Sequence, residues 1–136
     1  MNEFHLTVVT PDGTEFDGNA TSLLVKTDSG DVEILANHAD YFASLGIGRA
    51  RIQTNGEAKI ASCAGGFLSV KKNEVMLVAT TFEFADEIDI ERALAAKESA
   101  EEAISRSSDD KTLMLAKAKL SRALNRINVV DLVKTR

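Results

Sequence analysis

Three arginines and one aspartate stand at a spacing that could do chemistry. Asp89 and Arg92 lie three residues apart near the start of one alanine-rich stretch. Arg122 and Arg126 lie four residues apart near the end of the next, and residues at such spacings share one face of an α-helix. If the two stretches are antiparallel helices, these side chains converge beside a helix N-terminus, where guanidinium groups suit a polyphosphate. The alternative is a set of Asp–Arg ion pairs between the helices, or a solvated face.

No other set of residues points to catalysis. Cys63 is the single cysteine and His5 and His38 are its only candidate bases, so we expect a structural role for the thiol. The sequence contains no P-loop, no Gly-x-Ser-x-Gly motif and no cluster with metal-ligand spacing. We therefore expect a protein that is not an enzyme, with no catalytic residue and no bound metal.

Two helices must position the arginines. No glycine or proline occurs after residue 84, and alanine, leucine, lysine and glutamate recur there with helical spacing. This predicts helices over about residues 90–105 and 110–130, with Asp86 and Asp89 placed as candidate N-caps for the first. Stripes of small and aliphatic residues on both helices favour an antiparallel hairpin with close packing.

The preceding part of the chain has the pattern of a β-sheet. Short runs of alternating apolar and polar residues are separated by turn signals, among them residues 10–13 (TPDG), Asn55-Gly56 and an interruption at Gly65-Gly66. Many short strands predict an antiparallel β-sandwich or flattened barrel. The expected fold class is α+β, with a β-sandwich domain over residues 1–86 and a helical hairpin domain over residues 87–136.

Composition and charge limit the kinds of partner that we expect this protein to bind. Hydrophobic residues make up 44% and charged residues 27%, which is typical of a folded globular protein. The net charge of -5 and the lack of a basic cluster with aromatics argue against nucleic-acid binding. No apolar run is long enough to span a bilayer, so we expect no direct membrane insertion. A single cysteine provides no disulfide framework, which is typical of a protein in a reducing compartment.

Several short runs, in their order and spacing, resemble the epsilon subunits of bacterial F-type ATP synthases. They are residues 8–13 (VVTPDG), 30–31 (GD), 34–35 (IL), 38–39 (HA), 65–68 (GGFL) and 88–93 (IDIERA). Each run alone is a weak signal, but together they cover both expected domains and nearly the whole chain.

This resemblance implies a non-catalytic subunit of the central stalk, or rotor, of a proton-translocating ATP synthase. The β-sandwich would lie between the gamma subunit and the c-ring, at the cytoplasmic side of the bacterial cell membrane. The hairpin would either fold back or extend toward the alpha/beta catalytic head, where it inhibits ATP hydrolysis. No cofactor would be required, and ATP would be a regulatory ligand. A free-standing ATP-sensing or adaptor module is the alternative function.

The resemblance also implies site residues. Those of an ATP site would be Glu83, Ile88, Asp89, Arg92, Ala93, Arg122 and Arg126. Those of the rotor interface would be Asp31, His38 and Phe42. Two departures from the family pattern concern these sites: Ser99 replaces a basic residue of strong ATP binders, and the loop segment at residues 33–38 (EILANH) lacks the family's glycine and proline.

Overall fold

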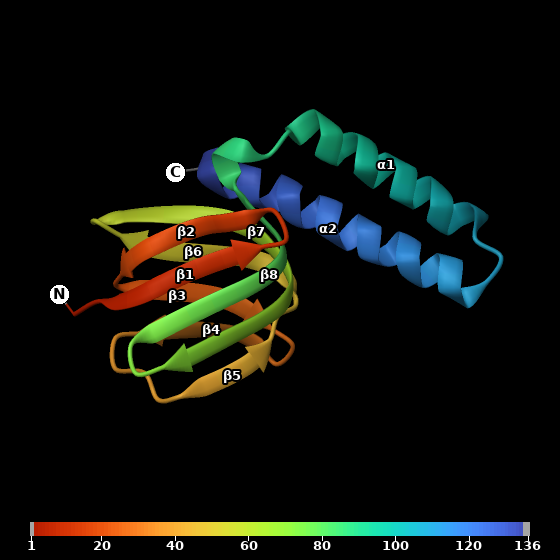
Figure 1. Ribbon diagram of the computed structural model, residues 1–136. Helices are drawn as coiled ribbons and strands as arrows, with labels where there is room; N and C mark the ends of the chain where they lie inside the picture. Colours follow the sequence, from red (N-terminus) through yellow and green to blue (C-terminus); the bar gives the residue numbers. More distant parts are fainter. Residues whose placement is uncertain (1, 135–136) are drawn as a thin grey trace. The chain divides into compact units, whose positions relative to one another are not determined.

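The computed structural model describes residues 2–134 and divides into two compact units, the first ending at Phe84 and the second beginning at Ala85. The first unit holds eight strands: β1 (Phe4–Thr10), β2 (Gly13–Ala20), β3 (Ser22–Thr27), β4 (Gly30–Leu35), β5 (Tyr41–Ser44), β6 (Ile47–Thr54), β7 (Glu57–Lys71) and β8 (Glu74–Phe84). The second holds a 3₁₀ turn, η1 (Ala85–Glu87), and the helices α1 (Ile90–Arg106) and α2 (Asp110–Lys134) (Figure 1). The predicted fold class, a β-sandwich followed by two helices, is confirmed.

The strands of the first unit form one sheet in the order β2-β1-β8-β7-β6-β3-β4, with β5 paired to β7. Four pairs of consecutive strands form antiparallel hairpins: β1–β2, β3–β4, β6–β7 and β7–β8. However, β1 and β8 pair in parallel, which the sequence pattern did not predict. No short turn joins parallel strands, so this pairing depends on closure of the whole unit. The sheet folds over so that β2 approaches β6, where the Thr54 hydroxyl donates to the backbone carbonyl of Asn19 at 2.7 Å.

Alternation along the strands builds the core. On β1, Phe4, Leu6 and Val8 are buried, while His5 and Thr7 are half-buried on the other face. The core cluster consists of residues of the first unit alone, with its largest buried side chains coming from β1, β3, β4, β6, β7 and β8. The first unit therefore has a hydrophobic core of its own.

Strand β7 is continuous through Gly65 and Gly66, where the sequence predicted an interruption. The first part of β7 pairs with β6 and the last part with β5, so the strand bends where its partner changes. Both glycines have positive φ, 72° and 92°, and a Cβ on Gly66 would lie 1.8 Å from the Val78 carbonyl oxygen. These glycines therefore bend the strand and do not end it.

Both predicted helices are present, and α2 continues to Lys134, past the predicted end at residue 130. The Asp109 carboxylate accepts the Thr112 backbone N–H at 2.7 Å at the start of α2, and this hydrogen bond lowers the pKa of Asp109. The buried residues of the two helices are nearly all small, as close helix packing requires: Ala93, Ala100, Ala116, Ala123 and Val129.

His5 links three strands on the outer face of the sheet. Its Nε2 lies 2.6 Å from an Asp17 carboxylate oxygen on β2, and its Nδ1 lies 2.8 Å from a Glu74 carboxylate oxygen on β8. The hydrogen bond to Glu74, followed by that to Asp17, raises the pKa of His5. Both ring nitrogens donate only when the imidazole is charged, so protonated His5 fastens β2 and β8 to β1.

We predict that stability falls as pH rises through the raised pKa of His5. Folding favours the charged ring, so this contribution is complete below the ordinary pKa of 6.5 and is lost above the folded-state value. His5→Gln should abolish this pH dependence. His38→Gln is the matched control, because the His38 ring contacts two uncharged groups, the Ala39 carbonyl at 2.8 Å and the Tyr41 ring. Thermal unfolding of the full chain across this pH range measures the effect, and equal pH dependence in wild type and His5→Gln would contradict it.

Candidate functional site

The start of α1 positions two of the predicted site residues. Asp89 is the N-cap residue, with extended backbone (φ -81, ψ 101), and its carboxylate accepts the Arg92 backbone N–H at 3.1 Å. This bond satisfies one of the free donors of the helix end. The Arg92 side chain is exposed in the first turn, where the helix dipole adds partial positive charge. Arg92 and the helix dipole thus favour an anion here, while the Asp89 and Glu91 carboxylates beside them oppose one.

The register of the hairpin places the arginines. The Lys119 ammonium donates to the Ser99 hydroxyl at 3.4 Å, which sets the two helices level at these residues. Arg92 lies seven residues before Ser99 and Arg126 lies seven residues after Lys119, so helices of equal rise bring the two arginines to one level. Arg122 lies one turn nearer the helix connection, on the face of Arg126. This register supports the predicted convergence of the arginines.

Lys119 is a cation of this region that the sequence reasoning missed. The sequence has Ser99 at the position where strong ATP binders of the family carry a basic residue. In the hairpin, α2 supplies an ammonium group beside Ser99. Counting equal distances from the helix connection would have found Lys119, because antiparallel helices face each other at matched distances from their turn.

The remaining predicted ATP residues have different surroundings. Ile88 lies between η1 and α1, and its backbone N–H donates to the Ala85 carbonyl at 3.3 Å. Ala93 is buried in the helix pair, where its small side chain allows the two helices to pack closely. Glu83 belongs to the first unit, half-buried near the end of β8 and opposite Ser62 of β7.

The three predicted rotor-interface residues lie on β4, on β5 and in the loop between them. His38 lies in the β4–β5 loop, and its ring meets Tyr41 edge-on with centroids 5.8 Å apart. Phe42 follows on β5. Asp31 lies at the opposite end of β4, 3.8 Å from the Arg49 guanidinium, and about 13 Å of extended strand separates it from the loop.

Phe42 belongs to an exposed apolar face that the sequence reasoning did not identify. It stacks on Phe67 of β7, with ring centroids 5.2 Å apart, and is 67% exposed. Met76, 45% exposed, pairs with Ser69, which in turn pairs with Phe42, so these side chains share one face of the sheet. The sequence signal for this face is the run at residues 75–78, which is apolar at every position. A strand with one solvent-exposed face would instead alternate apolar and polar residues.

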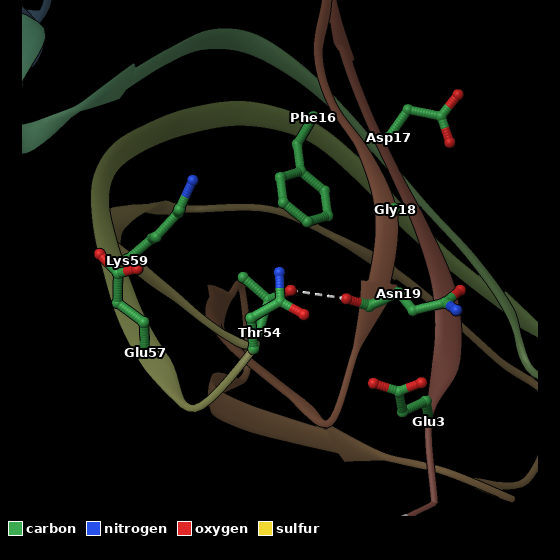
Figure 2. Close-up of a pocket in the computed structure, with 9 residues that line it drawn as sticks. Glu3, Phe16, Asp17, Gly18, Asn19, Thr54, Glu57 and Lys59 are labelled. Atoms are coloured by element: carbon green, nitrogen blue, oxygen red, sulfur yellow. Dashed lines mark hydrogen bonds between the residues drawn. The ribbon is translucent and has the colours of Figure 1, made fainter.

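A polar pocket of about 420 Å³ lies between β2 and the β6–β7 hairpin (Figure 2). No predicted site residue lines it. Asp17 in its wall is already bonded to His5, and the Lys59 ammonium lies 5.8 Å from the centre of the Phe84 ring. Because Asp17 and Lys59 already contact other side chains of the sheet, we assign no ligand to the pocket. Its lining residues are Glu3, Phe16, Asp17, Gly18, Asn19, Thr54, Asn55, Glu57 and Lys59.

Other reactive groups are not poised for chemistry. Burial raises the pKa of the Cys63 thiol to about 12, so this side chain remains a protonated thiol. Within residues 2–134, no group of three His, Cys, Asp or Glu side chains is arranged to hold a metal ion. Neither helix in this part of the chain is both long and apolar enough to cross a bilayer.

Comparison with known proteins covers both units. Residues 3–85 match the family described as ATP synthase, Delta/Epsilon chain, beta-sandwich domain, and residues 86–131 match its long alpha-helix domain. The ATP synthase epsilon chain of Bacillus velezensis is 40% identical over 129 residues, which cover 95% of this chain and 98% of that protein. The epsilon chain of Caldicellulosiruptor bescii is 36% identical over 131 residues, 96% of each chain.

Two solved structures share the fold. A chain of the Euglena gracilis mitochondrial ATP synthase has a TM-score of 0.79 at 21% identity, covering 97% of this chain and 81% of that one. A chain from the central stalk and c-ring of the Tetrahymena thermophila enzyme has a TM-score of 0.66 at 15% identity, covering 95% and 97%. With both family domains matched in order and curated relatives aligned over nearly their full length, the chain belongs to the ATP synthase delta/epsilon family, as an epsilon chain.

Proposed function

We propose that this chain is a non-catalytic subunit of the central stalk of an F-type ATP synthase, peripheral to the membrane on its cytoplasmic side. The observation that carries this proposal is the match of both units, in order, to epsilon chains that are 34–40% identical. The likeness in fold to a chain from a central stalk and c-ring assembly supports it.

The exposed face around Phe42 and Met76 is the proposed contact with the gamma subunit. Exposed apolar side chains that adjoin across neighbouring strands are uncommon on a monomer and mark surfaces that a partner covers. Phe42, stacked on Phe67, supplies an aromatic anchor of the type that dominates interfaces. The c-ring is the second proposed partner, on the basis of the family resemblance at Asp31 and His38.

The hairpin is the proposed regulatory element. It leaves large apolar side chains in water, with Met114 72% and Leu115 64% exposed. Such residues favour a second conformation in which a partner covers them. In this proposal the helices extend toward the alpha/beta catalytic head and inhibit ATP hydrolysis there.

ATP is the proposed ligand of the folded hairpin. Arg92 and Arg126 lie level on the two helices, so a triphosphate bridging them would bind only when the helices are paired. A ligand shifts a conformational equilibrium by its difference in affinity for the two states. ATP should therefore stabilise the folded hairpin and relieve inhibition. Asp89 would hold the helix start or orient the base or ribose, since a carboxylate repels phosphate.

Removing every residue after Asp86 tests whether the β unit joins the stalk and the helical unit inhibits hydrolysis. The core cluster comes from the first unit alone, so we predict that residues 1–86 fold and still join the stalk. Inhibition of ATP hydrolysis should be lost. Circular dichroism of the fragment and hydrolysis rates of the reconstituted enzyme measure these outcomes. An unfolded fragment would contradict the first expectation, and undiminished inhibition the second.

Arg126→Ala tests the ATP site. We predict that this variant weakens ATP binding by about 1.5–3 kcal/mol, the range for a charge-assisted hydrogen bond. Arg126→Lys should recover only part of the affinity, because an ammonium lacks the guanidinium fork. Lys111→Ala, an exposed change in the first turn of α2, is the control and should bind ATP as wild type does.

Calorimetric titration of the full chain with ATP measures these affinities, and Glu83→Gln belongs in the same series. Equal affinity in wild type and Arg126→Ala would reduce the arginines to a structural role. No binding to wild type would remove the ATP site altogether, while leaving the stalk assignment intact.

A further inference from the structure

Within residues 2–134, three asparagines have left-handed backbone conformations, each in a connection between strands. Asn37 (φ 64°) lies between β4 and β5, Asn55 (φ 52°) between β6 and β7, and Asn73 (φ 62°) between β7 and β8. Asparagine is a chemically labile residue, because the backbone nitrogen of the next residue can attack its side-chain carbonyl carbon. The reaction needs both that nitrogen and the side chain to be free, so the three positions can be compared directly.

Asn37 and Asn73 hold each other in place. The Asn37 backbone N–H donates to Asn73 Oδ1 at 2.6 Å, and the Asn73 side-chain amide donates to Asn37 Oδ1 at 3.1 Å. The residues that follow them are engaged as well. The His38 backbone N–H donates to the Leu35 carbonyl at 3.2 Å, and Glu74 already belongs to the β7–β8 ladder. Attack at either asparagine therefore requires existing hydrogen bonds to break first.

Asn55 differs from both on each count. It is exposed, and its side chain makes no hydrogen bond within the part of the chain that the structure describes. The next residue, Gly56, lies in the loop itself, because the ladder of β6 and β7 closes at Thr54 and Glu57. The Gly56 backbone N–H is therefore outside the ladder. Glycine has no side chain to shield this nitrogen, and a Cβ at this position would meet no other part of the fold within 4 Å.

We propose that Asn55 is a site of spontaneous deamidation, at which the turn of the β6–β7 hairpin modifies itself. The Gly56 nitrogen forms a bond to Asn55 Cγ, and its proton leaves with the side-chain amino group as ammonia. Water then opens the resulting cyclic imide at either of its two carbonyl carbons. One opening yields aspartate, and the other yields isoaspartate, in which the backbone runs through the former side-chain carbonyl carbon. Water is the only co-reactant of this sequence.

The isoaspartate product alters the hairpin where the β unit closes. It inserts one extra backbone atom into a two-residue turn, whose geometry sets the pairing of the flanking strands. Next to this turn, the Thr54 hydroxyl donates to the Asn19 carbonyl of β2 at 2.7 Å (Figure 2), and the Thr21 backbone N–H donates to the Gln53 carbonyl at 2.8 Å. We therefore expect isoaspartate to weaken the links between β6 and the end of β2.

Incubation of the full chain at mildly alkaline pH, followed by peptide mapping with mass spectrometry, tests the site. Asn55 should be converted at least about tenfold faster than Asn37 or Asn73. A tenfold difference in rate corresponds to about 1.4 kcal/mol of activation free energy, comparable with one hydrogen bond that must break. An isoaspartyl methyltransferase with a labelled methyl donor counts isoaspartate separately from aspartate. An unmodified Asn55, or conversion of Asn73 at the same rate, would overturn the proposal.

A second turn of the chain provides a matched gain-of-reactivity test. Lys72 and Asn73 have φ values of 49° and 62°, close to the 52° and 75° of Asn55-Gly56. The double variant Lys72→Asn with Asn73→Gly therefore places the same pair in the same kind of turn, and it should deamidate there at about the rate of Asn55. Asn55→Gly is the control, because two glycines suit such a turn and leave no amide to react. A double variant that stays intact in the β7–β8 turn would contradict the argument from turn position.

The effect on the fold is measured on the isoaspartate form after its separation by ion-exchange chromatography. Its melting temperature should fall by about 4–8 °C, the shift that the loss of about one hydrogen bond produces in a domain of this size. Asn55→Asp adds the same charge with an unchanged backbone and should melt as wild type does, because Asp-Gly also suits the turn. Equal melting of the isoaspartate form and wild type would contradict the weakened closure. These experiments use the isolated chain, so their outcome is independent of the proposed function.

Discussion

The close approach of Gly66 to β8 is the constraint on which the β unit depends. A Cβ at this position would lie 1.8 Å from the Val78 carbonyl oxygen, so no other residue fits without moving the backbone. At this bend, β7 changes its partner from β6 to β5, while its pairing with β8 continues across the bend from Ala61 to Lys71. One bent strand therefore joins both parts of the sheet. Without the bend, the face that carries Phe42 and Phe67 would not form.

The β unit is closed by interactions that are distant in sequence. The parallel pairing of β1 with β8, the His5–Glu74 contact and the Asn37–Asn73 pair all join residues that no local turn brings together. Together they give a platform whose exposed loop and apolar face hold fixed positions. A platform of this kind suits the proposed place in the central stalk, because a mobile surface would lose binding affinity to the ordering of its side chains.

The helical unit is built on a different principle. Its seam consists largely of alanines, which bury little apolar area per residue, and Met114 and Leu115 remain in water. Pairing of the two helices is therefore weakly supported by the hydrophobic effect. A marginal pairing can be shifted by a ligand of ordinary affinity, which is what the proposed regulation by ATP requires.

Local signals in the sequence predicted the local features of the fold. Alternation of apolar and polar residues predicted the strands, Asn55-Gly56 predicted a hairpin, and Asp89 predicted the start of α1. Each of these features depends on residues only a few positions apart. The parallel β1–β8 pair and the Asn37–Asn73 bonds could not be read in the same way, since they depend on closure of the whole sheet. Gly65-Gly66 was misread because two glycines suit a turn and a bent strand equally well.

The candidate site shows the same division. Helix periodicity predicts Arg122 and Arg126 on one face, and the register of the hairpin places Arg92 level with Arg126. Lys119 was missed because it became relevant only once the helix register was known. Phe67 and Met76 were not singled out, because apolar residues on both faces of a strand do not reveal whether the second face is buried by the chain itself or by a partner.

The most direct measurement is the composition of ATP synthase purified through a tag on this chain. Quantitative mass spectrometry of the intact complex should find the chain equimolar with the gamma subunit and accompanied by the c-ring. Intact enzyme that lacks the chain, or a tagged chain that is recovered only as a free monomer from cells containing assembled enzyme, would contradict the account.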